Sequence, residues 1–165
     1  MNANTVIAVS ATVIAVASLT VSVYEARAAR MHNRRSVQPP LGLRTGFPVG
    51  GTAGLVLINS GLGPAKIMGS KLTIDGVLRG DFSKPNVDKL RDILSVRPHA
   101  TTLGGQPFLD TGYEQFLLSV DSYDPSEHRE FRELIDHRLR IEIQYDSLYA
   151  ERFTVVYGHV REPGA

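Results

Sequence analysis

The first 24 residues of the chain carry no charged side chain, and no other feature constrains the fold as strongly. Glu25 is the first charged residue, and four arginines follow within the next ten positions: Arg27, Arg30, Arg34 and Arg35. The uncharged stretch Thr5–Val23 is rich in Val, Ala, Ser and Thr. As a helix it would be about 28 Å long, which nearly matches the roughly 30 Å hydrocarbon core of a bilayer. We therefore expect residues 1–24 to form a transmembrane helix.

Two other interpretations of this stretch fit less well. A cleaved signal peptide begins with positively charged residues, and none precedes the apolar run here. Ala26-Arg27-Ala28 has the spacing of a cleavage site, but the Arg inside it and the neighbouring Glu25 are unfavourable. A buried helix of a soluble protein normally carries a polar stripe, whereas this stretch has only small hydroxyl side chains. The pattern favours a single membrane span.

The arginines also predict the orientation of the span. Residues 25–40 form a basic juxtamembrane segment, and positive residues favour the cytoplasmic side. We expect the N-terminus outside the cell membrane and the C-terminal domain in the cytoplasm. The opposite orientation remains an alternative, because one weak span can insert either way. The arginines themselves have two interpretations: a topology signal, which we favour, or a membrane-surface site for anionic lipid head groups.

Small residues recur along the span at spacings of three and four, which places them on one helical face: Ala8, Ala11, Ala15, Ser18 and Ser22. Such a face lets two helices approach closely in lipid. Because Ala, Ser and Thr make up half of the segment, a face of this kind can also arise by chance. The pattern indicates a homo-oligomer or a membrane protein partner, in addition to the lipid bilayer.

Beyond residue 40 the sequence alternates between short apolar runs and turn signals, which is typical of β-strands. Asp75-Gly76 is a type I′ hairpin signal, and Asp146–Glu151 separates two alternating runs at the C-terminal end. The expected strands are Leu41–Phe47, Leu55–Ile58 (buried on both sides), Ala65–Met68, Lys71–Ile74, Tyr113–Val120 (with Phe116, Leu118 and Val120 on one side), Leu139–Tyr145 and Phe153–Tyr157.

Two short helices are expected between the strands. Val87, Leu90 and Leu94 have helical spacing, which predicts an amphipathic helix over Val87–Leu94. Asp124-Pro125-Ser126-Glu127 has the residues of a capped helix start. Seven or so strands with one or two short helices predict that residues 41–160 form an antiparallel β-sandwich of immunoglobulin-like type, followed by a tail, 161–165. The paired Cys and core Trp of antibody domains are absent.

Three stretches of the chain resemble a known pattern. They are Arg30–Pro39 (RMHNRRSVQP) after the uncharged span, Ile58–Ala65 (INSGLGPA), and Tyr145–Phe153 (YDSLYAERF). In this order they resemble small bacterial single-span membrane proteins of unknown function. The resemblance implies a bacterial membrane protein with a β-sandwich head, and it supplies no catalytic residue.

The sequence contains no constellation that predicts catalysis, a cofactor or a metal. The glycine-rich Gly61–Lys66 lacks the spacing of either nucleotide-binding loop and is more simply a turn between strands. No histidine pair has the spacing of a metal site, no nucleophile elbow is present, and the chain has no Cys. Without residues 1–35 the domain has 14 basic and 16 acidic residues, a net charge of −2. We therefore expect a non-enzymatic protein that does not bind nucleic acid.

Aromatic residues gather in the C-terminal hairpin, and Tyr149 lies at its predicted tip. An exposed Tyr can anchor a partner, although it can also cover its own domain. The sequence thus predicts a membrane-anchored interaction or assembly module that uses a sheet edge or Tyr149. The alternative is a membrane-tethered ligand sensor or small effector, which would need a pocket between the sheets and would signal through its transmembrane helix.

Overall fold

The computed structural model describes residues 2–36, 40–105 and 108–158. The chain divides into two units, residues 1–36 and residues 37–165, which are described separately. We call the second unit the head.

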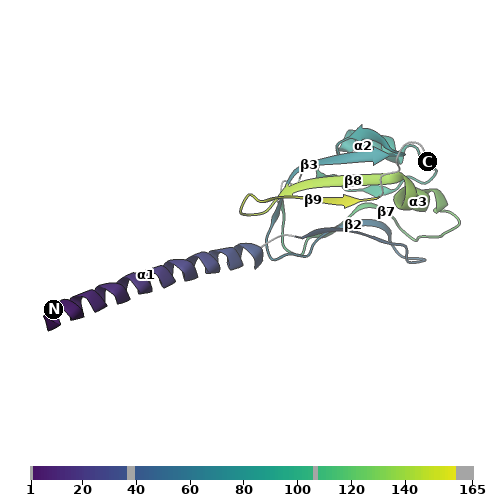
Figure 1. Cartoon of the computed structure of the whole chain (residues 1–165). Coiled ribbons are helices and arrows are strands. Elements are labelled where there is room, and N and C mark those ends of the chain that lie inside the picture. Colours follow the sequence, from purple (N-terminus) through teal and green to yellow (C-terminus); the bar gives the residue numbers. More distant parts are fainter. Residues whose placement is uncertain (1, 37–39, 106–107, 159–165) are drawn as a thin grey trace. The chain divides into compact units, whose positions relative to one another are not determined.

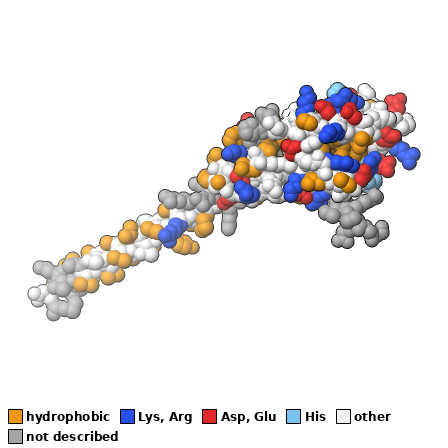
Figure 2. Space-filling view, turned by 90° about the horizontal axis from the view of Figure 1, so that it is seen from above, with side chains coloured by type: hydrophobic (Ala, Val, Ile, Leu, Met, Phe, Trp, Pro, Cys, Tyr) orange, Lys and Arg blue, Asp and Glu red, His pale blue; other side chains and the backbone are white. Residues whose placement is uncertain are grey.

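The first unit is one continuous helix, α1 (Ala3–Ser36) (Figure 1). It includes the expected span and continues through most of the basic segment. Within the described residues, one helix is long and apolar enough to cross a membrane, over Val9–Ala29, with a mean hydropathy of 1.6. None of that stretch is buried within the protein. The apolar N-terminal helix is therefore confirmed, and its exposed side chains are mostly hydrophobic, as Figure 2 shows.

The head is a mainly-β domain of two antiparallel sheets, as expected. The first sheet has the order β1-β2-β7-β5, with β1 (Leu41–Gly46), β2 (Ala53–Asn59), β7 (Glu114–Val120) and β5 (His99–Ala100). The second has the order β4-β3-β8-β9, with β4 (Val77–Gly80), β3 (Ala65–Ile74), β8 (Leu139–Asp146) and β9 (Arg152–Tyr157). The short β6 (Phe108–Leu109) pairs with the start of β3. Figure 1 shows β3, β8 and β9 in one layer and β2 and β7 in the other.

The two predicted hairpins are confirmed. β3 and β4 are joined by Asp75 and Gly76, whose φ angles of 52° and 78° are those of a type I′ turn. β8 pairs with β9, with Tyr145 opposite Phe153, and the two rings stack with centroids 5.5 Å apart. Along β8 every second residue is buried, which is the alternation of a strand with one face on a core.

Short helical elements connect the strands. The helix α2 (Lys84–Arg91) follows β4, and a 3₁₀ turn, η1 (Leu103–Gly105), precedes β6. The helix α3 (Arg129–Glu133) continues directly into a π-helical turn, η2 (Leu134–Arg138), which leads into β8.

One hydrophobic core joins the two sheets and the helices. Its members have little or no exposed surface and come from both sheets, from α2 and from the α3–η2 segment; they include Leu55, Leu57, Leu72, Leu90, Leu118, Phe131, Ile141 and Ile143. The sheets are also joined by a buried polar contact, because the backbone N–H of Leu41 donates to the hydroxyl of Tyr145 at 3.4 Å. The head is therefore closed between its sheets.

Three details of β3, α2 and β2 differ from the sequence-based expectations. The runs Ala65–Met68 and Lys71–Ile74 form one strand, β3, with an irregular register between Ile67 and Gly69. The amphipathic helix begins three residues earlier than expected, because Pro85 fits its first turn. In β2, Leu55 and Leu57 are buried, but Val56 and Ile58 are half-exposed, so this strand is not buried on both sides.

Two further differences concern β7 and α3. Leu55 and Val56 pair with Leu118 and Phe116, so Leu117 is an extra residue in β7. Such a bulge breaks the expected two-residue alternation, and Leu117 is buried together with Leu118. The Asp124 carboxylate accepts a hydrogen bond from the Ser126 N–H at 2.7 Å, but this stabilises a turn, and α3 begins only at Arg129.

Candidate functional site

The residues predicted to associate helices lie on α1. Ala11, Ala15, Ser18 and Ser22 are exposed and follow the spacing of one helical face. The Ser22 hydroxyl donates to the carbonyl of Ser18 at 2.9 Å, so this polar group is satisfied inside the helix. The side chain of Ala8 lies outside the described residues.

The basic residues next to the span are also helical. Arg27 is exposed on α1. The side chains of Arg30, Arg34 and Arg35 lie outside the described residues. Of the four guanidinium groups in the predicted membrane-surface site, the structure therefore describes that of Arg27.

Tyr149 lies in the loop between β8 and β9, where the predicted tip is found. The buried Ser147 organises this loop: its hydroxyl accepts hydrogen bonds from the N–H groups of Tyr149 (3.3 Å) and Glu151 (3.2 Å). Ala150 adopts a positive φ of 58° and donates its N–H to the Ser147 carbonyl. This ordered turn leaves Leu148 and Tyr149 with 64% and 42% of their surface exposed.

A shallow cleft of about 240 Å³ lies beside this loop and is lined in part by Lys66, Phe108 and Leu148. Phe108 and Leu148 are both exposed. The cleft and the loop therefore expose Phe108, Leu148 and Tyr149 at the surface. Phe108 lies opposite Lys66 in the β3–β6 pair.

The loop Asn59–Pro64 is a turn between strands, as the sequence indicates, and Asn59 holds it. The fully buried Asn59 amide donates to the carbonyls of Gly63, Leu109 and Asp110 at 2.9–3.1 Å, and its oxygen accepts from the Gly61 N–H. The Asn59 side chain thus joins the turn 60–64 to the segment 109–110, which is a structural role.

A larger cleft, of about 560 Å³, lies between α2 with the turn after it, the β3–β4 hairpin and the end of η2; we call it the α2–β4 cleft. Among the described residues, the cleft lining includes none from the other sheet, so the cleft does not lie between the two sheets. Its charged lining residues are Arg79, Lys89, Arg138 and Asp75. Its apolar lining residues include Leu78 and Ile93, which are 61% and 54% exposed, and the buried Ile74 and Leu90.

Two interactions shape this cleft. Arg138 donates two hydrogen bonds of 2.8 Å to the two carboxylate oxygens of Asp75, and this contact raises the pKa of Arg138. At Gly80, where φ is +119°, a Cβ would lie 2.6 Å from the side-chain amide of Asn86. The missing side chain of Gly80 therefore leaves the space that the Asn86 amide occupies. Asn86 in turn donates to the Asp81 carboxylate, and the hydrogen bond from Ser83 holds the pKa of Asp81 below its ordinary value.

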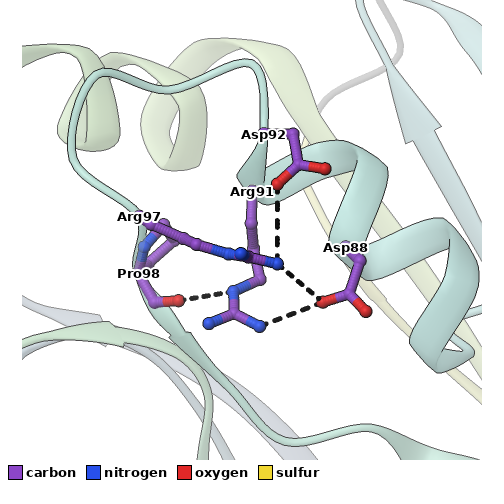
Figure 3. Close-up of polar contacts among 5 residues, drawn as sticks. All are labelled: Asp88, Arg91, Asp92, Arg97 and Pro98. Carbon is purple, nitrogen blue, oxygen red and sulfur yellow. Dashed lines mark hydrogen bonds and ion pairs between the residues drawn. The ribbon is translucent and has the colours of Figure 1, made fainter.

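The opposite face of α2 is fixed to the loop that follows it (Figure 3). Arg91 donates to the carbonyl of the buried Pro98 at 2.6 Å and to Asp88 at 3.0 Å. Arg97 reaches Asp88 and Asp92 at 3.4 and 3.5 Å. These contacts join the C-terminal half of α2 to the loop that follows it.

The described residues contain no cluster of three His, Asp or Glu side chains that could hold a metal ion. The buried His128 is placed by its own neighbourhood: its ring nitrogen Nδ1 accepts from the Asp124 N–H at 3.1 Å, and its ring lies 5.7 Å from that of Tyr123. These contacts stabilise the turn before α3.

Comparison with protein-family models finds no match, and no curated protein matches the chain at a significant level. What the head binds therefore has to be inferred from its own side chains. The sequence predicted the hairpin tip from its turn residues, but it did not predict the α2–β4 cleft. The available signal was Ile93, four residues after Lys89 in the helix expected over Val87–Leu94, which places an apolar residue beside a cation.

Proposed function

We propose that the protein is a membrane-anchored, non-enzymatic interaction or assembly module. α1 crosses the cell membrane once, the N-terminus lies outside, and the head lies in the cytoplasm. The observation that carries the proposal is the pairing of an apolar helix with a closed β-rich head whose ordered hairpin tip exposes Leu148 and Tyr149. An apolar tip on a well-fixed turn can anchor a partner at small entropic cost.

We further propose that the head is an immunoglobulin-like sandwich. In that class one sheet has the strand order A-B-E-D, and the other contains G-F-C, extended by C′ in variable-type domains. Assigning A, B, C, C′, D, E, F and G in chain order to β1, β2, β3, β4, β5, β7, β8 and β9 gives the observed order of both sheets. The resemblance to small bacterial single-span membrane proteins points to the same architecture and to a bacterial origin.

Partner capture by the hairpin tip is testable by crosslinking in intact membranes. Tyr149→Ala should reduce recovery of the partners of the wild-type chain at least about fivefold, as expected when a central aromatic anchor is removed. Val49→Ala is a suitable control, because Val49 is 74% exposed in a different turn. Equal recovery of the same partners by all three proteins would exclude the hairpin tip as the interaction site.

The second candidate function, a membrane-tethered ligand sensor or small effector, is supported by the α2–β4 cleft. The sequence-based alternative placed its pocket between the sheets, but the core occupies that space, so that form of the alternative is wrong. A sensor built on this head would have to use the α2–β4 cleft instead. α1 would then carry the signal.

A further inference from the structure

Among the residues that the structure describes, the lining of the α2–β4 cleft has an excess of positive charge. Of its three cations, Arg138 is paired with Asp75 through two short hydrogen bonds. Within the described part of the chain, Arg79 and Lys89 make no ion pair and no side-chain hydrogen bond. The two come from different elements, Arg79 from β4 and Lys89 from α2, and both line the same cleft.

Apolar surface accompanies this charge. Leu78 and Ile93 lie beside the two free cations and are more than half exposed, while Ile74 and Leu90 are buried at the inner side. Covering apolar surface contributes roughly 25 cal/mol of favourable free energy per Å² removed from water, so an apolar group placed on Leu78 and Ile93 would be stabilised. Figure 2 shows Lys and Arg side chains next to hydrophobic ones on the face of the head that it views.

The volume and the construction of the cleft are those of a small-molecule site. Its volume of about 560 Å³ falls within the roughly 300–1,000 Å³ range of ligand pockets. The Arg91 and Arg97 contacts join α2 to the loop that follows it, and the Arg138–Asp75 pair in the cleft lining joins the hairpin to the end of η2. Side chains and segments that are already fixed lose little conformational entropy when a ligand binds.

We propose that the α2–β4 cleft binds a small organic anion with an apolar group, its carboxylate or phosphate facing Arg79 and Lys89 and its apolar group against Leu78 and Ile93. The two unpaired cations provide charge complementarity, and the apolar residues exclude water from it, which strengthens the electrostatic attraction. The site is distinct from the hairpin tip and does not depend on the orientation of the span.

Methyl NMR of the full chain in phosphatidylcholine nanodiscs, with labelled isoleucines and hexyl phosphate as the probe, tests this proposal. Ile74 and Ile93 line the cleft, and their signals should shift and saturate, whereas those of Ile58 and Ile67 should not. Arg79→Gln and Lys89→Gln should each raise the Kd at least about fivefold, by loss of a charge-assisted contact. Lys84→Gln, on the same helix but outside the cleft, should change the Kd less than about twofold.

Further ligands separate the two parts of the site. Leu78→Asn should weaken hexyl phosphate but not inorganic phosphate, which should bind at least about tenfold more weakly than hexyl phosphate to the wild type. Hexyltrimethylammonium should leave Ile74 and Ile93 unshifted. If nanodiscs that contain phosphatidic acid shift the same signals without added probe, the ligand is a lipid; if only hexyl phosphate does so, it is a soluble anion.

Three results would overturn the proposal. The first is no saturable shift of Ile74 and Ile93 with hexyl phosphate up to about 10 mM, which corresponds to a binding free energy weaker than about −3 kcal/mol. The second is an equal effect of Lys84→Gln and Lys89→Gln, and the third is equal binding of the cationic probe. None of these results bears on partner capture by the hairpin tip.

Discussion

At Gly54 the backbone of β2 passes so close to β7 that no side chain fits. A Cβ on Gly54 would lie 2.0 Å from the carbonyl oxygen of Leu118. The register of this strand pair is therefore tied to one residue that lacks a side chain. It shows how a residue can be essential to a sheet without making any side-chain contact.

Gly54→Ala should therefore destabilise the head by about 2–4 kcal/mol, since backbone atoms of β7 have to move. Gly46, its pairing partner on β1, is the matched control, because a Cβ there meets nothing within 4 Å. Gly46→Ala should change the stability by less than about 0.5 kcal/mol. Thermal unfolding of the full chain, followed by circular dichroism, measures both, and equal melting temperatures would contradict this account of the β2–β7 contact.

Glu130 makes the folding stability of the head depend on pH. Its carboxylate accepts a hydrogen bond of 3.1 Å from the backbone N–H of Ser95, and this holds the pKa of Glu130 below its ordinary value. A pKa that is lower in the folded state adds stability above the unfolded-state pKa, and this stability is lost as the pH falls through the folded-state pKa.

We expect Glu130→Gln to melt at a lower temperature than the wild type at neutral pH, and we expect the difference to shrink between about pH 5 and pH 3. Glu127 is exposed on the turn before α3, and Glu127→Gln serves as the control with no such convergence. Melting curves across this pH range check the prediction. A difference that stays constant down to the lowest pH would rule out the Ser95 contact as its source.

At the scale of elements, local sequence patterns predicted the structures that depend on neighbouring residues. Alternation along β8 and β9 and the Asp75-Gly76 turn predicted both hairpins, because neighbouring residues and a single turn fix these structures. The buried Leu117 was not predictable in this way, because the bulge that turns it inward depends on the pairing of β7 with β2. The α2–β4 cleft depends on four separate segments meeting, and no single stretch of sequence carries it.

The small-residue face of α1 allows a test at the same scale. If it packs against a second copy, replacing Ala11 and Ala15 together by Leu should abolish the dimer, because larger side chains prevent close backbone approach. Val9 and Val13 lie on the opposite face, and Val9→Leu with Val13→Leu should leave it intact. Energy transfer between chains labelled at Asn2→Cys in lipid vesicles measures association. If the double variant with Leu at Ala11 and Ala15 still forms the dimer, the small-residue face is not the dimer contact.

At the scale of the whole molecule, the charges divide between the two units. The chain has a formal net charge of +1, but residues 1–35 contribute +3 and residues 36–165 contribute −2. The near-neutral total thus consists of a basic segment beside the apolar stretch and a mildly acidic domain. The part of this distribution that bears on the proposed orientation is the group of four arginines directly after the apolar stretch, because the positive-inside rule counts Lys and Arg near the ends of a span.

The central claim is that α1 spans the membrane with the N-terminus outside and the head in the cytoplasm. Because the sequence has no Cys, single introduced cysteines can test it directly. Single cysteines at Asn2 and at the exposed Val49 place one thiol before the span and one on the head. With a membrane-impermeant maleimide, we predict that Asn2→Cys is labelled in intact cells and that Val49→Cys is labelled only after the cells are permeabilised. Labelling of Val49→Cys in intact cells, with Asn2→Cys protected, would contradict the cytoplasmic head, and release of the chain from membranes by alkaline carbonate would contradict the span itself.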